Sequence, residues 1–160
     1  MLIREKVGQA VGILNEFDCD CWITFVRETS AGSDPVIPLI YGSDLTWQSA
    51  LMISRTGEKV IILGRFEMEA ARRIGVYDKV IPYDQAISPV LLSELKRLNP
   101  GRIAINYSTN DTLSDGLSHG MYLVLMEYLK GTPFENRLVS AEPIIQALRG
   151  RKTKGEVARI

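Results

Sequence analysis

The order of helical and extended segments constrains the fold of this chain more than any other feature of its sequence. Segments rich in β-branched and aromatic residues, typical of buried strands, occur at 21–26, 79–83 and 102–106. Segments with apolar residues at helical spacing flank or separate them, at about 3–17, 66–74, 89–98 and 117–129. Strands that alternate with helices indicate an α/β fold with a partly parallel sheet.

A β-hairpin adds an antiparallel part to this sheet. Its strands are predicted at 49–54 and 59–63, with Gly57 in the turn between them. Because Pro82 cannot donate a backbone hydrogen bond, the strand at 79–83 is expected at an edge or a strand end. The predicted architecture is therefore α/β, with a mixed β-sheet flanked by helices. The apolar segment 38–42 is expected to fold back on the sheet. Segment 134–139 is expected to form a final extended piece.

Length and charge exclude several classes of protein. The 160 residues suffice for one ordinary domain, and 19 basic residues balance 19 acidic ones. Nucleic-acid-binding proteins usually have a basic excess or stripe, so the basic cluster at 149–154 is interpreted as a solvated connector. No apolar run approaches the ~20 residues of a membrane span, and the charged start at 1–6 lacks the apolar core of a signal peptide. We therefore expect a cytoplasmic protein with neither a nucleic-acid nor a membrane partner.

The sequence lacks the common motifs of catalysis. It contains no glycine-rich phosphate loop and no G-x-S-x-G nucleophile elbow. Its one histidine, His119, is interpreted as a surface residue at a helix start. Cys19 and Cys21 have no second pair to complete a zinc site, so we expect buried, reduced thiols on the same face of a strand. No catalytic residue and no metal ligand is predicted in this sequence.

The end of the sequence, from residue 141 on, predicts a short helix, a basic break and the start of another helix. Thr153 is a suitable N-cap, and Glu156 completes a capping box. A helix of about two turns is unstable alone, so we expect the chain to continue. Residues 1–150 are then one domain, and 151–160 are a linker and the start of a helix that leads into a further domain. A frayed tail on a complete small protein is the alternative.

The order of the elements and the closing segment resemble the N-terminal domain of the creatinase, prolidase and aminopeptidase P family, the pita-bread metallopeptidases. Residues 145–160, IQALRGRKTKGEVARI, are similar to the family's interdomain link, an R-x-x-K-[ST]-x-x-E pattern followed by apolar residues at helical spacing. Segment 39–42, LIYG, and the hairpin at 51–63 also resemble family segments. Gly155 departs from the pattern, since the family usually has a helix former there.

The resemblance implies an accessory domain with a ribonuclease H-like sheet. In the family a catalytic domain follows the link and binds two divalent metal ions (Mn, Co or Zn), and none of its metal-binding motifs occurs in these 160 residues. Such accessory domains pair subunits and restrict the catalytic cleft to short peptides with proline second. The expected function is therefore the non-catalytic half of an Xaa-Pro dipeptidase or aminopeptidase P. The implied partners are its own C-terminal catalytic domain, a second subunit and short Xaa-Pro peptides.

Three residues are predicted to lie near the substrate in such an enzyme. Arg27 follows a predicted strand and begins a polar loop, where its planar guanidinium could bind a substrate carboxylate. Tyr41 and Trp47 could form an apolar wall near a proline ring. The alternatives are a solvated strand end for Arg27, and core or interface packing for the two aromatic residues.

Two functions from different classes follow from the sequence. One is the non-catalytic half of a proline-specific metallopeptidase. The other is a stand-alone module of the same fold that binds peptides or another protein. A metal-binding domain after Ile160 would favour the first, and a natural chain that stops there would favour the second.

Overall fold

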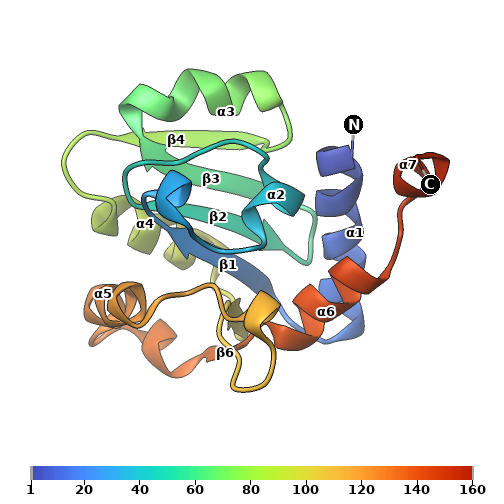
Figure 1. The fold of residues 1–160 in the computed structure, drawn as a ribbon. Helices are drawn as coiled ribbons and strands as arrows, with labels where there is room; N and C mark the ends of the chain where they lie inside the picture. Colours follow the sequence, from blue (N-terminus) through green and yellow to red (C-terminus); the bar gives the residue numbers. More distant parts are fainter. Residues whose placement is uncertain (1, 160) are drawn as a thin grey trace.

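The computed structural model describes residues 2–159, and at its centre lies a mixed sheet of six strands (Figure 1). The order across the sheet is β4-β3-β2-β1-β5-β6. Helices cover both faces, so the predicted α/β class with a mixed sheet is confirmed. The strands are β1 (Cys21–Val26), β2 (Ser49–Ser54), β3 (Lys59–Gly64), β4 (Lys79–Tyr83), β5 (Ile103–Ile105) and β6 (Leu138–Ser140).

The central strand, β1, has an antiparallel neighbour on one side and a parallel neighbour on the other. It pairs antiparallel with β2 and parallel with β5. The predicted hairpin is confirmed as β2 and β3, and Gly57 in its turn has a φ of 98°, which glycine adopts without strain. The β3–β4 and β5–β6 pairs are parallel. β4 is an edge strand, as Pro82 predicted.

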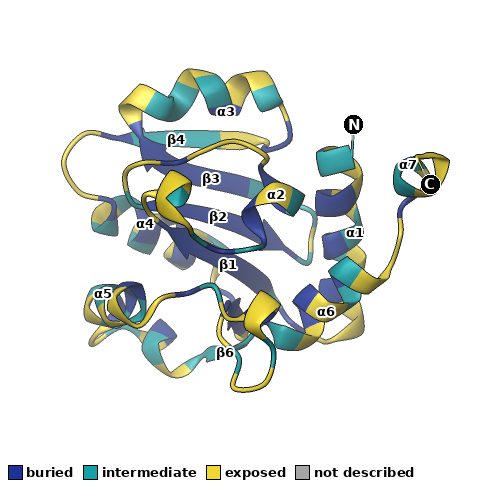
Figure 2. Cartoon of the chain, in the orientation of Figure 1, coloured by how far each residue is buried: buried dark blue, intermediate teal, exposed yellow. Residues whose placement is uncertain are grey.

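The sheet divides the apolar core into two clusters of buried side chains. One cluster lies between the sheet and α1, α2, α3 and α6, and the other lies beneath α4 and α5. Alternation along β1 sends Trp22 into the first cluster and Ile23 into the second. Figure 2 shows the resulting buried strands and the exposed outer faces of the helices. The helices are α1 (Leu2–Glu16), α2 (Ile37–Ile40), α3 (Met68–Ile74), α4 (Ser88–Leu98), α5 (His119–Leu129), α6 (Glu142–Gly150) and α7 (Lys154–Ala158).

Several element boundaries differ from the sequence prediction for local reasons. α4 begins at Ser88 itself, so its N-cap is Ile87, which has no side-chain acceptor. α5 begins two residues later than predicted, because the Ser118 side chain caps it by accepting from the Met121 N–H. Segment 134–139 is not extended throughout. It starts in a 3₁₀ helix, Pro133–Asn136, and only then enters β6.

The two cysteines do not share a face, which corrects the sequence prediction. Cys21 opens β1 and lies beneath the α4 and α5 layer, whereas Cys19 packs on the α1 side. The alternation rule fails here because Cys19 precedes the strand, in a turn where Asp18 has a φ of 52°. Both thiols are free and buried, as expected, and burial raises the pKa of each.

A buried polar network joins the strands to the loop that follows β1. The Trp22 indole N–H donates to Asn106 Oδ1 at 2.6 Å. Asn106 Nδ2 in turn donates to Thr24 Oγ1 at 3.1 Å and to Asp34 Oδ2 at 2.7 Å. Asp34, only 3% exposed, also accepts from the Val36 N–H at 3.0 Å. The network therefore fixes the end of the 27–36 loop against β1 and the end of β5.

A buried lysine holds the connection between α6 and α7. Lys6 is 3% exposed, and its Nζ donates to the carbonyls of Leu148 at 2.5 Å and Arg151 at 2.8 Å. The same Nζ lies 2.8 Å from the Glu156 carboxylate. Thr153 and Glu156 form the predicted capping box at the start of α7. The helix break falls where the domain boundary is expected, and the boundary itself stays a prediction.

Within residues 2–159, no helix has the length and apolarity that a bilayer span requires.

Replacing Asn106 by alanine should lower the free energy of unfolding by about 3 kcal/mol, because the Trp22 and Asp34 side chains then lose a buried partner. Urea unfolding followed by circular dichroism measures this change. Asn110→Ala is the matched control, since Asn110 is exposed, and its effect should stay within about 0.5 kcal/mol. Equal effects of the two substitutions would contradict the importance of the network.

Candidate functional site

Side chains from four strand ends gather at one end of the sheet. Because β1, β3, β4 and β5 all run in the same direction and β2 runs against them, their carboxyl ends meet the amino end of β2. Arg27 follows β1, Trp47 precedes β2, Phe66 follows β3, and Tyr83 ends β4. Ligands in open α/β sheets commonly bind outside the carboxyl ends of the strands. This end of the sheet is therefore the first candidate site.

The loop that carries Arg27 is fixed to the segment before β2. The Glu28 N–H donates to the Thr46 carbonyl at 2.9 Å, and the Thr29 N–H donates to the Leu45 carbonyl at 2.9 Å. Glu28 has a φ of 49°, a left-handed conformation that non-glycine residues rarely adopt. These bonds fix the backbone on either side of this turn. The base of the Arg27 side chain is thereby held in place, while its guanidinium remains exposed.

Trp47 is the centre of an aromatic cluster at the surface. Its ring centroid lies 5.8 Å from that of Tyr83 and 5.8 Å from that of Phe66. Trp47 is 40% exposed and Phe66 is 88% exposed, so neither is a core residue. The Glu67 carboxylate accepts from the backbone N–H groups of Thr46, at 2.9 Å, and Trp47, at 3.3 Å. This carboxylate therefore positions the backbone from which the Trp47 ring projects.

Arg27 and Trp47 line the same cavity, of about 380 Å³. Gln48 lies between two phenols: Tyr83 Oη donates to the Gln48 carbonyl at 2.7 Å, and Tyr128 Oη donates to Gln48 Oε1 at 2.8 Å. Burial raises the pKa of Tyr83 to about 12, so this phenol stays protonated and able to donate at neutral pH. A cavity with one guanidinium and several aromatic walls suits a carboxylate that is attached to an apolar ring.

Arg27 also lines a second, smaller cavity of about 230 Å³. Ser118 and Met121, from the first turn of α5, form another part of its wall. Backbone N–H groups at a helix start carry partial positive charge. The start of α5 and Arg27 both favour an anionic group in this smaller cavity, and Glu28 opposes it. Arg27 and Glu28 also line the larger cavity.

The structure does not bring Tyr41 to these cavities. Tyr41 is 0% exposed and packs edge-on against Tyr77 in the cluster on the α1 side of the sheet. Burial raises the pKa of Tyr41 to about 12. Of the three residues predicted near a substrate, only Arg27 and Trp47 share a cavity. Their role toward a substrate stays a prediction, and Tyr41 has a core position.

Sequence reasoning missed the other residues that line the shared cavity, and three of them, Gln48, Tyr83 and Tyr128, make the hydrogen bonds described above. A usable signal was present for the first two, because they lie at the ends of predicted strands whose ends meet once strand directions are assigned. Tyr128 lies on a helix, and only the packing of α5 on the sheet brings it to Gln48. Within residues 2–159, no three His, Cys, Asp or Glu side chains come together as a metal-ligand set.

No family model and no curated protein sequence matches this chain. Solved structures do match it. A Xaa-Pro dipeptidase from Bacillus anthracis superposes with a TM-score of 0.65 at 17% identity, over 98% of this chain and 38% of that one. An X-Pro aminopeptidase from Thermotoga maritima gives 0.67 at 15% identity, over 96% and 38%.

The chain also matches a solved structure that consists of an N-terminal domain alone. The N-terminal domain of a Xaa-Pro dipeptidase from Lactobacillus brevis matches with a TM-score of 0.62 at 16% identity, over 88% of this chain and 98% of that domain. The chain thus spans about two fifths of two complete relatives and nearly all of one N-terminal domain. The resemblance stated from the sequence is confirmed at the level of fold, which is that of the N-terminal domain of Xaa-Pro peptidases.

Glu67→Ala should speed the hydrogen exchange of the Thr46 and Trp47 amides by about tenfold, because both lose a charged acceptor. Amide exchange followed by NMR measures this. Glu69→Ala is the control, since Glu69 lies nearby on α3 and pairs only with Arg72, at 3.6 Å, among the described residues. Unchanged exchange in Glu67→Ala would show that the carboxylate does not hold this segment.

Asp34 should make stability depend on pH. Burial raises the pKa of Asp34 above its ordinary value, against the opposing effect of the Asn106 hydrogen bond. Between the ordinary carboxyl pKa of about 4 and the raised folded value, the folded state binds more protons than the unfolded state, so stability falls as pH rises.

Urea unfolding at a series of pH values tests this effect. The stability of the natural chain relative to Asp34→Asn should decrease as pH rises from about 4, because the variant has no carboxyl group to ionise. Asp78→Asn is the control, since Asp78 is exposed. A difference that stays constant or grows with pH would contradict the assignment.

Proposed function

We propose that this chain is the non-catalytic N-terminal domain of a proline-specific metallopeptidase, of the Xaa-Pro dipeptidase or aminopeptidase P type. In this proposal the domain pairs two subunits and shapes access to a catalytic cleft that a following domain supplies. The two divalent metal ions (Mn, Co or Zn) that activate water for peptide hydrolysis would be held there. The proposal includes a cytoplasmic location.

The observation that carries the proposal is the extent of the structural match. Nearly the whole chain superposes on about two fifths of a Xaa-Pro dipeptidase, and on nearly all of one isolated N-terminal domain. The contacts of the connection after α6 also support it. Lys6 contacts the end of α6 and the first turn of α7, so the chain leaves the sheet in a defined direction.

The cavity beside Arg27 gives the domain a direct role in this proposal. The Arg27 guanidinium would bind the carboxylate of a short peptide, and the Trp47 ring would pack against its proline ring. Both contacts would be made equally in the enzyme–substrate complex and in the transition state. They would therefore affect substrate binding more than the rate of the chemical step. Arg27 is thus a binding residue, and the hydrolytic groups belong to the following domain.

Kinetics of the full-length enzyme test this role. Arg27→Ala should lower kcat/KM for Xaa-Pro dipeptides by about tenfold, mainly through KM, because one charge-assisted contact is lost. Arg73→Ala is the matched control, since Arg73 is an exposed arginine on α3 that lines neither cavity. An unchanged kcat/KM in Arg27→Ala would overturn the role of the cavity.

The length of the natural reading frame tests the domain assignment separately. A metal-binding domain encoded after Ile160 supports the peptidase proposal, and a stop at that point overturns it in favour of a stand-alone binding module.

A further inference from the structure

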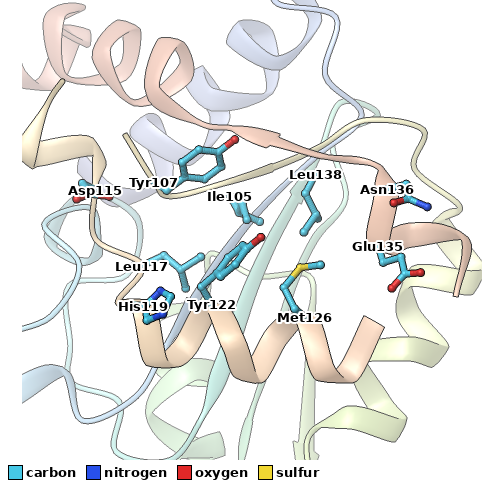
Figure 3. A pocket seen from close by; sticks show the side chains of 10 residues that line it. All are labelled: Ile105, Tyr107, Asp115, Leu117, His119, Tyr122, Met126, Glu135, Asn136 and Leu138. Atoms are coloured by element: carbon cyan, nitrogen blue, oxygen red, sulfur yellow. The ribbon is translucent and has the colours of Figure 1, made fainter. Parts of the chain in front are cut away.

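The helices on one face of the sheet leave part of it uncovered. Packed helices lie about 8–10 Å apart and neighbouring strands about 4.8 Å apart, so two helices cover roughly four strands. The face beneath α4 and α5 belongs to a sheet of six strands. The uncovered part lies over β5 and β6, beside α5 (Figure 3).

A groove of about 550 Å³ occupies this uncovered part, well within the 300–1,000 Å³ of ligand pockets. Ile105 of β5 and Leu138 of β6 form an apolar floor. Tyr122 and Met126 of α5 form one wall. The groove therefore offers apolar surface that no helix of the described chain covers.

The charged side chains that line the groove are carboxylates. Figure 3 shows Asp115 near one end and Glu135 near the other. Within residues 2–159 neither carboxylate forms an ion pair, and no lysine or arginine lines the groove. Asp115 accepts only a backbone N–H, that of Ser108, at 3.0 Å. Two carboxylates beside aromatic rings attract a cation and not an anion.

The strand beside the groove has a free edge. The Ile103 N–H donates to the Arg137 carbonyl at 2.9 Å, and the Ala141 N–H donates to the Ile105 carbonyl at 2.8 Å, so these groups of the β6 segment face β5. Because backbone groups alternate in direction along a strand, those of Leu138 and Ser140 face away from the sheet. An extended peptide could pair with them and place alternate side chains over the groove.

We infer that this groove binds an extended peptide segment that carries a lysine or arginine. The peptide pairs with the outer edge of β6, an apolar side chain packs on Leu138, and the basic side chain reaches Asp115 or Glu135 along a tyrosine ring. This inference is independent of the proposed function, because it concerns a cavity that Arg27 and Trp47 do not line.

Binding to the chain of residues 1–160 tests the inference without any enzymatic assay. The probes are acetyl-Leu-Ser-Lys-amide, whose leucine and lysine lie on the same face of an extended strand, and its isostere with norleucine in place of lysine. Methyl NMR follows Met126, which lines the groove, with Met52, buried within the sheet, as the internal reference. The lysine peptide should shift the Met126 methyl signal and bind at least tenfold more tightly than the norleucine peptide.

Two variants and a matched control locate the charge requirement. Asp115→Asn and Glu135→Gln should each weaken lysine-peptide binding, and the double variant should bring it to the level of the norleucine peptide. Glu127→Gln should leave binding unchanged, since Glu127 is exposed on α5 outside the groove. All these side chains are at the surface or groove, and circular dichroism confirms that each variant is folded.

Three outcomes would overturn the inference. The first is equal binding of both peptides, and the second is a shift of the Met52 methyl signal without a shift of the Met126 signal. The third is equal binding of n-butylamine and the lysine peptide, because it would mark a site for small amines. If Arg27→Ala left kcat/KM unchanged, the peptide-binding result at the groove would not be affected. The two proposals can therefore fail independently of each other.

Discussion

Asn106 makes the hydrogen bonds on which the organisation of the α1 side of the sheet depends. It lies directly after β5, where its amide links the Trp22 indole, Thr24 and Asp34. Burying these groups is favourable only because each has a partner, since an unpaired polar atom in the core costs about 1–3 kcal/mol. The space around Asp34 is equally restricted: a Cβ on Gly116 would overlap its carboxylate. The loop that starts at Arg27 is therefore anchored at its far end by the core itself.

α5 separates two cavities of opposite character. Its first turn, with Ser118 and Met121, faces the cavity beside Arg27, where the fixed charge includes a cation. His119, Tyr122 and Met126 face the groove with two carboxylates. His119 is exposed at the helix start, as the sequence predicted. One helix thus presents different side chains to the two cavities on its two sides.

The sequence predicted those parts of the fold that local patterns determine. The strand at 21–26 and the hairpin around Gly57 were predictable because β-branched runs and turn residues act over a few positions. Core packing of Tyr41 was one of two alternatives that the sequence left open. The sequence could not choose between them for Tyr41 or for Trp47, because each position depends on which face of the sheet a connecting segment covers. The Asn106 network also escaped prediction, since its partners are up to 84 positions away and give no local pattern. Arg27 was identified because it follows a predicted strand, and Trp47 because its ring suits an apolar wall. The groove was not identified, because an uncovered face is a property of the assembled layers.

The central position of β1 has a consequence for how the chain folds. Its antiparallel partner, β2, pairs with it across 23 to 33 positions, from Val26 with Ser49 to Cys21 with Ser54, whereas β5 pairs with it across 82 positions, as in Cys21 with Ile103. Closing the larger loop costs more chain entropy and is the slower event. The three-stranded meander of β1, β2 and β3 should therefore assemble early, and the outer edge of β1 then stays exposed until β5 docks. During synthesis, the ribosome must release residues beyond 105 before that edge can be covered, so chaperone binding would matter most in this interval.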